Sequence, residues 1–483
     1  MGVLTNLEPK EVFEFFEEIC AIPHGSRDTK RISDYLVAFA KERSLEHYQD
    51  DLNNVVIIKE ASKGYEKSEP IILQGHMDMV CEKTPESTID FTKDGLTLAI
   101  DGDWLHAVGT TLGGDDGIAV AMALAALDSD TLEHPRLEAV FTVDEELGME
   151  GAEGLDVSML KGEKFLNMDS EEEGIFTVSC AGGVTADSFV PVKREQAEGR
   201  MLHITIGGLQ GGHSGAEIDK ERGSANVLIG RALYYIDKVA DVRLVSCAGG
   251  SKDNAITKMA DAEILVSEAD VENVKEAVAE LDHELKHEYV ISDTGVYAKC
   301  EDMGHTTGNA LDIESSERAI SFMMCAPHGI LNMSVDIKGL VETSLNLGVL
   351  KLTESELRAT FAIRSAVQSR QDYLADKVVA LTESLGGTVQ FSGAYPGWEY
   401  RQDSPFRDTC VAVFKKLYGK EPDIEAIHAG LECGLFSGKM NGKIDAVSIG
   451  PDMTGVHTSD ERLSIPSVKR TWEFVCEVLK ESK

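Results

Sequence analysis

Three neighbouring carboxylates, Asp144, Glu145 and Glu146, end an apolar run in the stretch TVDEELG, residues 142–148. Adjacent like charges repel each other, and burying them is costly unless a positive group neutralises them. An exposed turn would leave them in solvent, whereas a bound metal ion would neutralise them directly. The metal interpretation requires further ligands elsewhere in the chain.

Other strand-like runs also end in side chains that bind metals. IILQGHMD places His76 and Asp78 after a buried strand, and FLNMDSEEEG does the same for Asp169. GTTLGGDDG places Asp115 in a glycine-rich turn, and VSIGPDMTGVHTSDE contains His457. Because ligands of α/β sheets bind at the carboxyl ends of strands, we expect these groups to converge.

Each of these groups also has an ordinary explanation on its own. A His-x-Asp pair is often structural, Asp115 and Asp116 could cap a helix, and Glu145 and Glu146 could be solvated. Five coincident strand-end clusters with oxygen or imidazole ligands are hard to explain in this way. The sequence therefore predicts a metal site.

The ligand types restrict the metal and the reaction. Imidazole and carboxylate without thiolate fit Zn²⁺, Co²⁺ or Mn²⁺ better than Ca²⁺. Two histidines and three or four carboxylates are too many for one catalytic zinc ion, but two ions that share a bridging carboxylate can use them all. Such a pair lowers the pKa of a water molecule and polarises a carbonyl group, and a spare carboxylate can then act as general base.

The length and charge of the chain exclude several classes of protein. A chain of 483 residues is expected to form two domains. The net charge of −38 argues against nucleic acid and anionic membranes as partners. An acidic N-terminal stretch without a basic region and nine scattered cysteines predict a cytoplasmic protein with reduced thiols.

The pattern of elements predicts one domain interrupted by another. Residues 1–185 alternate between helix and strand patterns, which indicates an α/β sheet. Residues 186–395 contain alternating strands and amphipathic helices typical of an α+β domain, and the α/β pattern returns in 396–483.

Several motifs resemble known proteins. GHMDMV, GTTLGGDDG, DEELGMEG, NMDSEEEG and GPDMTGVHTSDE together resemble the cocatalytic dizinc aminoacylase and carboxypeptidase family of metallopeptidases. IPHGS, CAGG, LQGGHSGAEI, NAI, VETSLNLG, AYPGW and IHAGLECGLF are similar to one group of that family, the bacterial aminoacyl-histidine (Xaa-His) or cytosolic non-specific dipeptidases. The resemblance implies a zinc-peptidase catalytic domain with a central mixed sheet, 1–185 and 396–483, interrupted by a lid domain, 186–395.

The resemblance also implies a role for each site residue. Two zinc ions, or Co²⁺ or Mn²⁺ in their place, would share five ligands: His76 and Asp169 on one ion, Glu146 and His457 on the other, and Asp115 as the bridge. Asp78 would orient His76, as metal-bound imidazoles usually require, and Glu145 would be the general base and acid. The peptide bond after Asp115 would be cis.

Three lid residues match positions that contact the substrate in the family. His213 would help to stabilise the oxyanion, and Arg364 would bind the C-terminal carboxylate of the substrate with its planar fork. Asn254 is a weaker candidate for the same pocket. In dimeric relatives the matching histidine comes from the partner subunit, so the resemblance leaves both a monomer and a homodimer open.

The chain departs from the family pattern in a few places. Asp116 stands where asparagine is common, and Glu171 to Glu173 are expected to be solvated. His428 and Glu432, in IHAGLECG, could line the substrate pocket or support the ligands, and the sequence does not choose between these roles.

The predicted function is metal-dependent hydrolysis of unblocked dipeptides. The preference for a C-terminal histidine, as in carnosine, rests wholly on the resemblance. An amidohydrolase or aminoacylase of the same broader family, acting on N-acyl amino acids or larger peptides, is an alternative. A catalytically silent metal-binding scaffold is the other, although a silent relative would be free to lose Glu145 and the ligands, which are all present.

Overall fold

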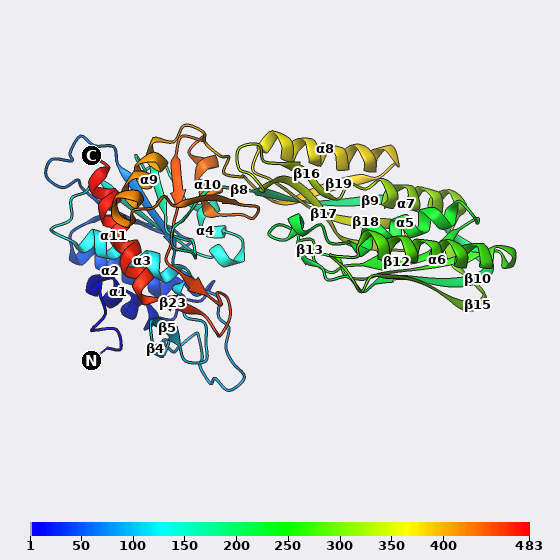
Figure 1. The fold of residues 1–483 in the computed structure, drawn as a ribbon, viewed down its shortest axis with the longest axis horizontal. Coiled ribbons are helices and arrows are strands. Elements are labelled where there is room, and N and C mark those ends of the chain that lie inside the picture. The colour runs from blue at the N-terminus through cyan, green and yellow to red at the C-terminus, as the bar shows by residue number, and fades with distance from the viewer. Residues whose placement is uncertain (1) are drawn as a thin grey trace. The chain divides into compact units, whose positions relative to one another are not determined.

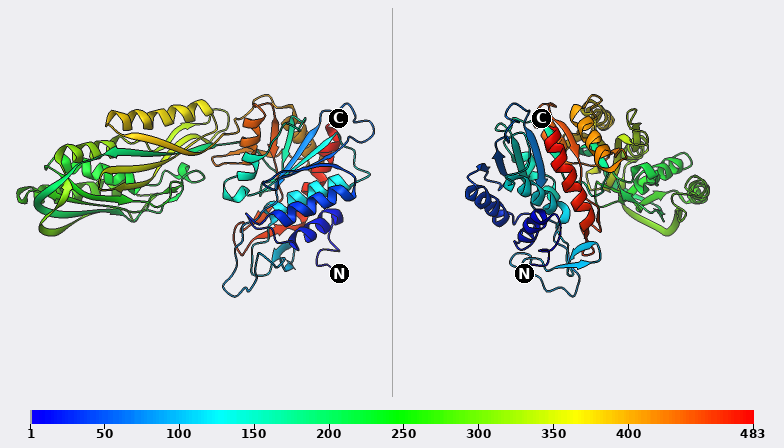
Figure 2. Two further views of the ribbon diagram at one scale, coloured as in Figure 1. Left: turned by 180° about the vertical axis from the view of Figure 1, so that it is seen from behind. Right: turned by 60° about the vertical axis from the view of Figure 1, so that its left-hand side comes forward.

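The computed structural model describes residues 2–483, which form two compact units. Unit 1 contains the residues up to Ser179, Tyr400–Ala426 and Leu431–Lys483, and unit 2 contains Cys180–Glu399 and Ile427–Gly430. In Figure 1, unit 1 is drawn in blue to cyan and in orange to red, and unit 2 in green and yellow. One unit is therefore built from segments at both ends of the sequence, and both termini lie in it (Figure 2).

A mixed sheet of eight strands forms the centre of unit 1. Its strands lie in the order β1 (Glu46–Gln49), β2 (Val55–Lys59), β6 (Leu137–Thr142), β3 (Ile71–His76), β7 (Lys164–Asn167), β21 (Asp445–Ser448), β8 (Ile175–Cys180) and β20 (Asp423–Ile427). The strands β6, β3, β7 and β21 are parallel, and the strands paired at either side of this group are antiparallel. The predicted central mixed α/β sheet is confirmed.

The parallel strands in the middle of this sheet are buried on both faces. Every residue of β3 and β6 is buried, as their continuous apolar runs indicated. His76 pairs with Thr142, so these two strands end at the same level of the sheet. The polar residues that follow them are thereby brought to one edge.

Helices and a small second sheet complete unit 1. The helices are α1 (Lys10–Cys20), α2 (Lys30–Glu42), α3 (Gly114–Asp128), α4 (Glu150–Gly154), α9 (Pro405–Tyr418), α10 (Glu432–Lys439) and α11 (Ile465–Glu481). The alanine-rich α3 is almost entirely buried and packs against α1 and β3. A four-stranded sheet consists of β22 (Met453–Thr454), β23 (Arg462–Ser464), β5 (Trp104–Ala107) and β4 (Leu98–Asp101), in that order. Its β4–β5 hairpin is the one that the sequence predicted around Gly102.

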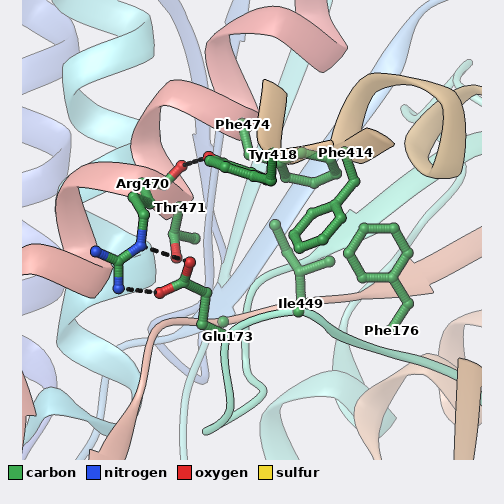
Figure 3. A pocket seen from close by; sticks show the side chains of 10 residues that line it. Glu173, Phe176, Phe414, Tyr418, Ile449, Arg470, Thr471 and Phe474 are labelled. Atoms are coloured by element: carbon green, nitrogen blue, oxygen red, sulfur yellow. Dashed lines mark hydrogen bonds and ion pairs between the residues drawn. The ribbon is translucent and has the colours of Figure 1, made fainter. Parts of the chain in front are cut away.

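Aromatic and ionic contacts join the two parts of unit 1. Phe176, on β8, packs against Phe414 of α9 and Phe474 of α11 with ring centroids 5.5 and 5.3 Å apart (Figure 3). Beside them, the Glu173 carboxylate accepts two hydrogen bonds from the Arg470 guanidinium, at 2.7 and 2.6 Å. The expectation that Glu173 is solvated is therefore wrong: this bidentate ion pair ties the segment after Asp169 to the last helix.

Unit 2 is an antiparallel sheet covered by helices. The strands lie in the order β15 (Tyr297–Leu311), β10 (Arg194–Gly207), β14 (Ala260–Val266), β12 (Arg243–Gly249), β17 (Val341–Leu352), β18 (Glu356–Ser365), β9 (Gly182–Pro191) and β19 (Thr388–Tyr395), and β16 (Gly329–Met333) also pairs with β17. The helices are α5 (Ala225–Asp237), α6 (Val271–Glu288), α7 (Ile313–Cys325) and α8 (Gln368–Ser384), and each packs against a neighbouring helix as well as the sheet (Figure 1). A separate two-stranded ladder pairs β11 (Gly212–His213) with β13 (Ala255–Ile256). Across residues 2–483, no helix combines the length and apolar character that a membrane span needs.

Candidate metal centre

The predicted ligands of unit 1 meet at one edge of its central sheet. They come from β3, from the turn after β6, from the loop after β7, from the first turn of α3, and from the loop between β22 and β23: His76, Glu146, Asp169, Asp115 and His457. Because β3, β6 and β7 are parallel neighbours, their carboxyl ends lie side by side. The geometry therefore assembles in one place five residues that span most of the chain.

Asp115 lies between the two histidines. Its Oδ1 is 2.9 Å from Nε2 of His76, and its Oδ2 is 3.1 Å from Nε2 of His457. Each oxygen of one carboxylate thus faces a different imidazole. This is the arrangement expected of a carboxylate that bridges two cations.

The other two carboxylates each lie beside one of the histidines. Glu146 Oε1 is 2.8 Å from Nε2 of His457, and Asp169 Oδ1 is 3.5 Å from Nε2 of His76. Ligand atoms of Asp115, Glu146 and His457 all lie within 4.8 Å of one another. Two sets of ligands, one around each histidine, therefore share Asp115.

Asp78 supports His76 from the side away from these carboxylates. The Nδ1 atom of His76 lies 3.0 Å from the backbone oxygen of Asp78 and 3.4 Å from its Oδ1. Asp78 Oδ1 also accepts from the backbone N–H of Glu145 at 3.2 Å, and Oδ2 accepts from the Ser26 hydroxyl at 2.8 Å. Nδ1 is engaged by a buried acceptor, so Nε2 is left to face the ligand set, as in metal-binding histidines.

Burial and mutual repulsion shift the pKa values at this edge. Burial raises the pKa of Glu145 to about 9, and the neighbouring Asp169, Glu432 and Glu146 add to the rise. Burial also raises the pKa of Asp169 to about 6. Hydrogen bonds to Asp115 and Glu146 raise the pKa of His457 to about 10. The protein alone thus neutralises the cluster by holding protons.

The residues fit a pair of divalent cations. Both imidazole Nε2 atoms face carboxylate oxygens, and every donor atom is nitrogen or oxygen, which suits Zn²⁺, Co²⁺ or Mn²⁺. Bound cations would replace the protons and relieve the repulsion between the carboxylates. The arrangement can therefore hold two metal ions while Glu145 stays beside them as an additional carboxyl group.

Asp116 lies beneath the ligands. It is fully buried, its Oδ2 accepts from the backbone N–H of His76 at 3.2 Å, and its Oδ1 has no hydrogen-bond partner among residues 2–483. Its oxygen atoms also approach His76 and Asp169 within 4.8 Å. The peptide bond between Asp115 and Asp116 is cis, which confirms the expectation from the resemblance.

Within unit 2, the backbone fixes the proton position on His213. Its Nδ1 accepts from the backbone N–H groups of Gly215 and Ala216, at 3.2 and 3.0 Å. Burial and the nearby Arg364 lower its pKa, which favours the neutral ring. The proton of that neutral ring is therefore on Nε2, which is available as a donor. Asn254 lies beside this segment, because its carbonyl accepts from the Ser214 N–H at 2.9 Å.

Arg364 lies in the same unit and contacts the hydroxyl group of Tyr395. Its guanidinium NH1 donates to the Tyr395 hydroxyl at 3.0 Å, whereas its buried Nε has no hydrogen-bond partner in the described chain. Gly183 pairs with both residues across the sheet, and a Cβ atom there would lie 2.6 Å from the Tyr395 ring. A glycine thus makes room for the tyrosine to reach the arginine.

The structure separates the two residues whose roles the sequence left open. His428 is buried in unit 2, with Nε2 2.7 Å from the Ser344 hydroxyl. Glu432 is buried in unit 1, where its Oε2 accepts from Gln74 at 2.5 Å and from Thr142 at 2.7 Å. Glu432 therefore lies in a polar layer below His76.

Sequence reasoning missed the supporting roles of Ser26 and Tyr395. Both lie in motifs that carried the resemblance, IPHGS and AYPGW, but neither is a residue type that signals metal or substrate binding by itself. Their roles depend on contacts with Asp78 and Arg364, which are distant in sequence.

Comparisons with known proteins identify similar chains and a matching family. The model of peptidase family M20/M25/M40 matches residues 72–481. The chain is 38% identical over 483 residues to the cytosol non-specific dipeptidase of Escherichia coli K12, covering 100% of this chain and 99% of the relative. The crystal structure of an aminoacylhistidine dipeptidase from Vibrio alginolyticus is similar with a TM-score of 0.94 and 36% identity, over 99% of this chain and 97% of that one. The aminopeptidase PepT of Bacillus cereus shares the fold, with a TM-score of 0.56 and 14% identity over 99% of both chains.

We expect metal binding to release protons, because His457 with a pKa of about 10 is protonated at neutral pH and must lose its proton to bind a cation. The affinity for Zn²⁺ should therefore rise from pH 6 to pH 8, by about tenfold per pH unit for each proton released. Calorimetric titration of chelator-stripped protein in buffers of different ionisation enthalpy would count the protons. A His457→Ala variant should release fewer protons, and an affinity that does not change with pH would contradict the prediction.

Proposed function

The chain belongs to peptidase family M20/M25/M40, and we propose that it is a metallopeptidase that hydrolyses unblocked dipeptides with two bound divalent cations. The observation that carries this proposal is the position of Asp115 between His76 and His457, with Glu145 beside them. The full-length similarity to two proteins named dipeptidases supports the substrate class.

We assign the ligands according to the two sets in the structure. His76 and Asp169 would hold one cation, Glu146 and His457 the other, and Asp115 would contact both. Zinc is the proposed metal because the donors are imidazole and carboxylate, and Co²⁺ or Mn²⁺ would suit the same donors. When bound, such a pair supplies Lewis acidity that activates water and polarises the peptide carbonyl.

Glu145 is the proposed general base and acid. In the protein alone its pKa is about 9, because it is buried among other carboxyl groups. Nearby cations would lower this pKa, so that near neutral pH the group can take a proton from water and return it to the leaving amine. Asp78 holds the backbone of Glu145 and the ring of His76 at once, which keeps base and ligand in a fixed relation.

The cluster in unit 2 supplies the groups that recognise the substrate. The Nε2–H of His213 would donate to the oxygen that becomes negative in the transition state. Arg364, held by Tyr395, would bind the free C-terminal carboxylate, and Asn254 would assist in the same pocket. Unit 2 would thus act as the family's lid domain and unit 1 as its catalytic domain.

The names of two relatives support the finer parts of the proposal. The Vibrio alginolyticus protein is an aminoacylhistidine dipeptidase by its title, so a preference for C-terminal histidine is part of the proposal. The E. coli relative is named a cytosol non-specific dipeptidase, which supports a cytoplasmic location for this chain.

A substrate panel tests the proposed function. Metal-free protein would be assayed before and after addition of Zn²⁺, Co²⁺ or Mn²⁺, with β-alanyl-histidine, several α-dipeptides, a tripeptide and an N-acetylated dipeptide. We expect metal-dependent cleavage of the unblocked dipeptides alone. Cleavage of only the acetylated substrate would identify an amidohydrolase instead, and no cleavage with any metal would contradict an enzyme.

Replacement of Glu145 by glutamine should suppress turnover without loss of the cations. Glutamine has a similar shape but cannot accept a proton, so we expect kcat to fall by about 100- to 10,000-fold. Metal content measured by mass spectrometry should remain at the wild-type value. Substantial retained activity would contradict the role of Glu145 as base.

Replacement of Arg364 by methionine should weaken binding of dipeptides, because the substrate carboxylate loses its charged partner. We expect KM to rise by about 10- to 100-fold, in line with a hydrogen bond between charged groups. Dipeptide amides, which lack the carboxylate, should be cleaved equally by both proteins. The matched control is Arg358→Met, an exposed arginine on the same strand, which should leave KM unchanged.

The His213→Ala variant can also show whether this histidine acts in the active site of its own chain or in that of a partner subunit. Mixed with Glu145→Gln protein, it would recover activity only if the chain is a homodimer in which each protomer lends His213 to its partner.

A further inference from the structure

Glu461 joins the two loops that carry Asp115 and His457. Its carboxylate accepts three backbone hydrogen bonds from the loop before Asp115: Oε2 from Leu112 at 2.7 Å and from Gly113 at 3.2 Å, and Oε1 from Gly114 at 2.8 Å. Glu461 is only 3% exposed. All of these atoms belong to unit 1.

Glycines make this contact possible on the side of α3. Gly113 has φ of +67°, a left-handed conformation that favours glycine, and it turns the chain so that successive N–H groups point at one carboxylate. A Cβ atom on Gly114 would lie 3.2 Å from Glu461 Oε1. The GTTLGGDDG motif therefore supplies the backbone N–H groups that bind the carboxylate of Glu461, in the TSDE motif.

The loop of His457 is closed by its own hydrogen bonds, and Glu461 stands at its end. Thr458 donates from its backbone N–H to the Gly455 carbonyl at 3.1 Å, and Glu461 donates to the Thr458 carbonyl at 3.2 Å. β23 follows directly and pairs with β5. Glu461 thus connects the end of the loop that carries His457 to the loop before Asp115.

We propose that Glu461 is a positioning residue that fixes the bridging Asp115 against His457, and so sets the affinity for the cation held by His457 and Glu146. It contacts neither histidine nor substrate and acts through the backbone on both sides. The other cation shares Asp115, but its remaining ligands, His76 and Asp169, lie on β3 and after β7, which Glu461 does not contact. We therefore expect that cation to be weakened less than the one held by His457. The inference rests on the proposed two-cation site but not on the proposed substrate.

The test is a titration of chelator-stripped full-length protein with Co²⁺ alone, followed by its visible absorption and by electron paramagnetic resonance. Wild-type protein should bind two ions with magnetic coupling between them. The binding step that disappears in His457→Ala protein identifies the ion held by that histidine. No substrate is used, so this result can be interpreted even if the protein proves not to be a dipeptidase.

Two variants separate position from charge. Glu461→Gln removes the charge and turns an amide N–H₂ toward backbone donors, whereas Glu461→Asp keeps the charge but shortens the side chain. We expect both to weaken the His457 ion by about 10- to 100-fold and to lose the coupling. The other ion shares Asp115 but keeps His76 and Asp169, so its affinity should change by less than about threefold. Weaker binding of the His457 ion in Glu461→Gln but not in Glu461→Asp would show that only the charge matters, which would overturn the proposal. Binding that is unchanged, or equally weakened for both ions, would overturn it as well.

Glu138 provides a matched control in the same unit. It is fully buried and its Oε2 likewise accepts from two backbone N–H groups, those of Lys161 and Gly162, at 2.8 and 3.0 Å. It lies near the start of β6, at the end of the strand opposite to the ligands. Glu138→Gln should lower thermal stability but leave both Co²⁺ steps unchanged, and a selective loss of the His457 ion here would contradict a specific role for Glu461.

Hydrogen exchange on the wild-type protein keeps the proposal testable if the Glu461 variants do not fold. The amides of Leu112, Gly113 and Gly114 share one acceptor, so we expect them to be protected and to exchange together. Fast exchange of these amides in the Co²⁺-loaded protein would show that Glu461 does not hold the loop before Asp115, and would contradict the proposal.

Discussion

Electrostatic repulsion between carboxylates is the constraint on which the rest of unit 1 depends. Three parallel strands and one helix bring acidic groups to a single sheet edge, where water cannot separate them. Without cations, the cluster keeps protons on Glu145 and His457 that free side chains would not carry at neutral pH. The fold therefore holds a site that keeps these protons until a cation replaces them.

Around this site, the hydrogen-bond partners of the remaining acidic side chains are neutral groups. Asp78 is satisfied by the Ser26 hydroxyl and a backbone N–H, and Glu432 by Gln74 and Thr142. These partners fix the direction of each acidic group without adding a competing positive side chain. The same logic applies in unit 2, where two backbone N–H groups fix the ring of His213 and leave one donor free.

Much of the fold and the meeting of the five candidate ligands could be predicted from the sequence because both depend on local patterns. Continuous apolar runs revealed β3 and β6, and the polar residues that end them had to meet once the strands were parallel. The contacts of Glu173, Tyr395 and Glu461 could not be predicted in this way. Each depends on the register of elements far apart in the chain, such as Gly183 lying opposite both Arg364 and Tyr395.

The position of β21 in the central sheet has a consequence for how the protein is made. β21 pairs with β7, yet it is synthesised only after the whole of unit 2, and His457 follows it. A growing chain on the ribosome therefore displays Asp115, Glu146 and Asp169 long before the second histidine exists. During that interval the acidic edge lacks both β21 and His457, so the five candidate ligands can meet only after unit 2 has been synthesised.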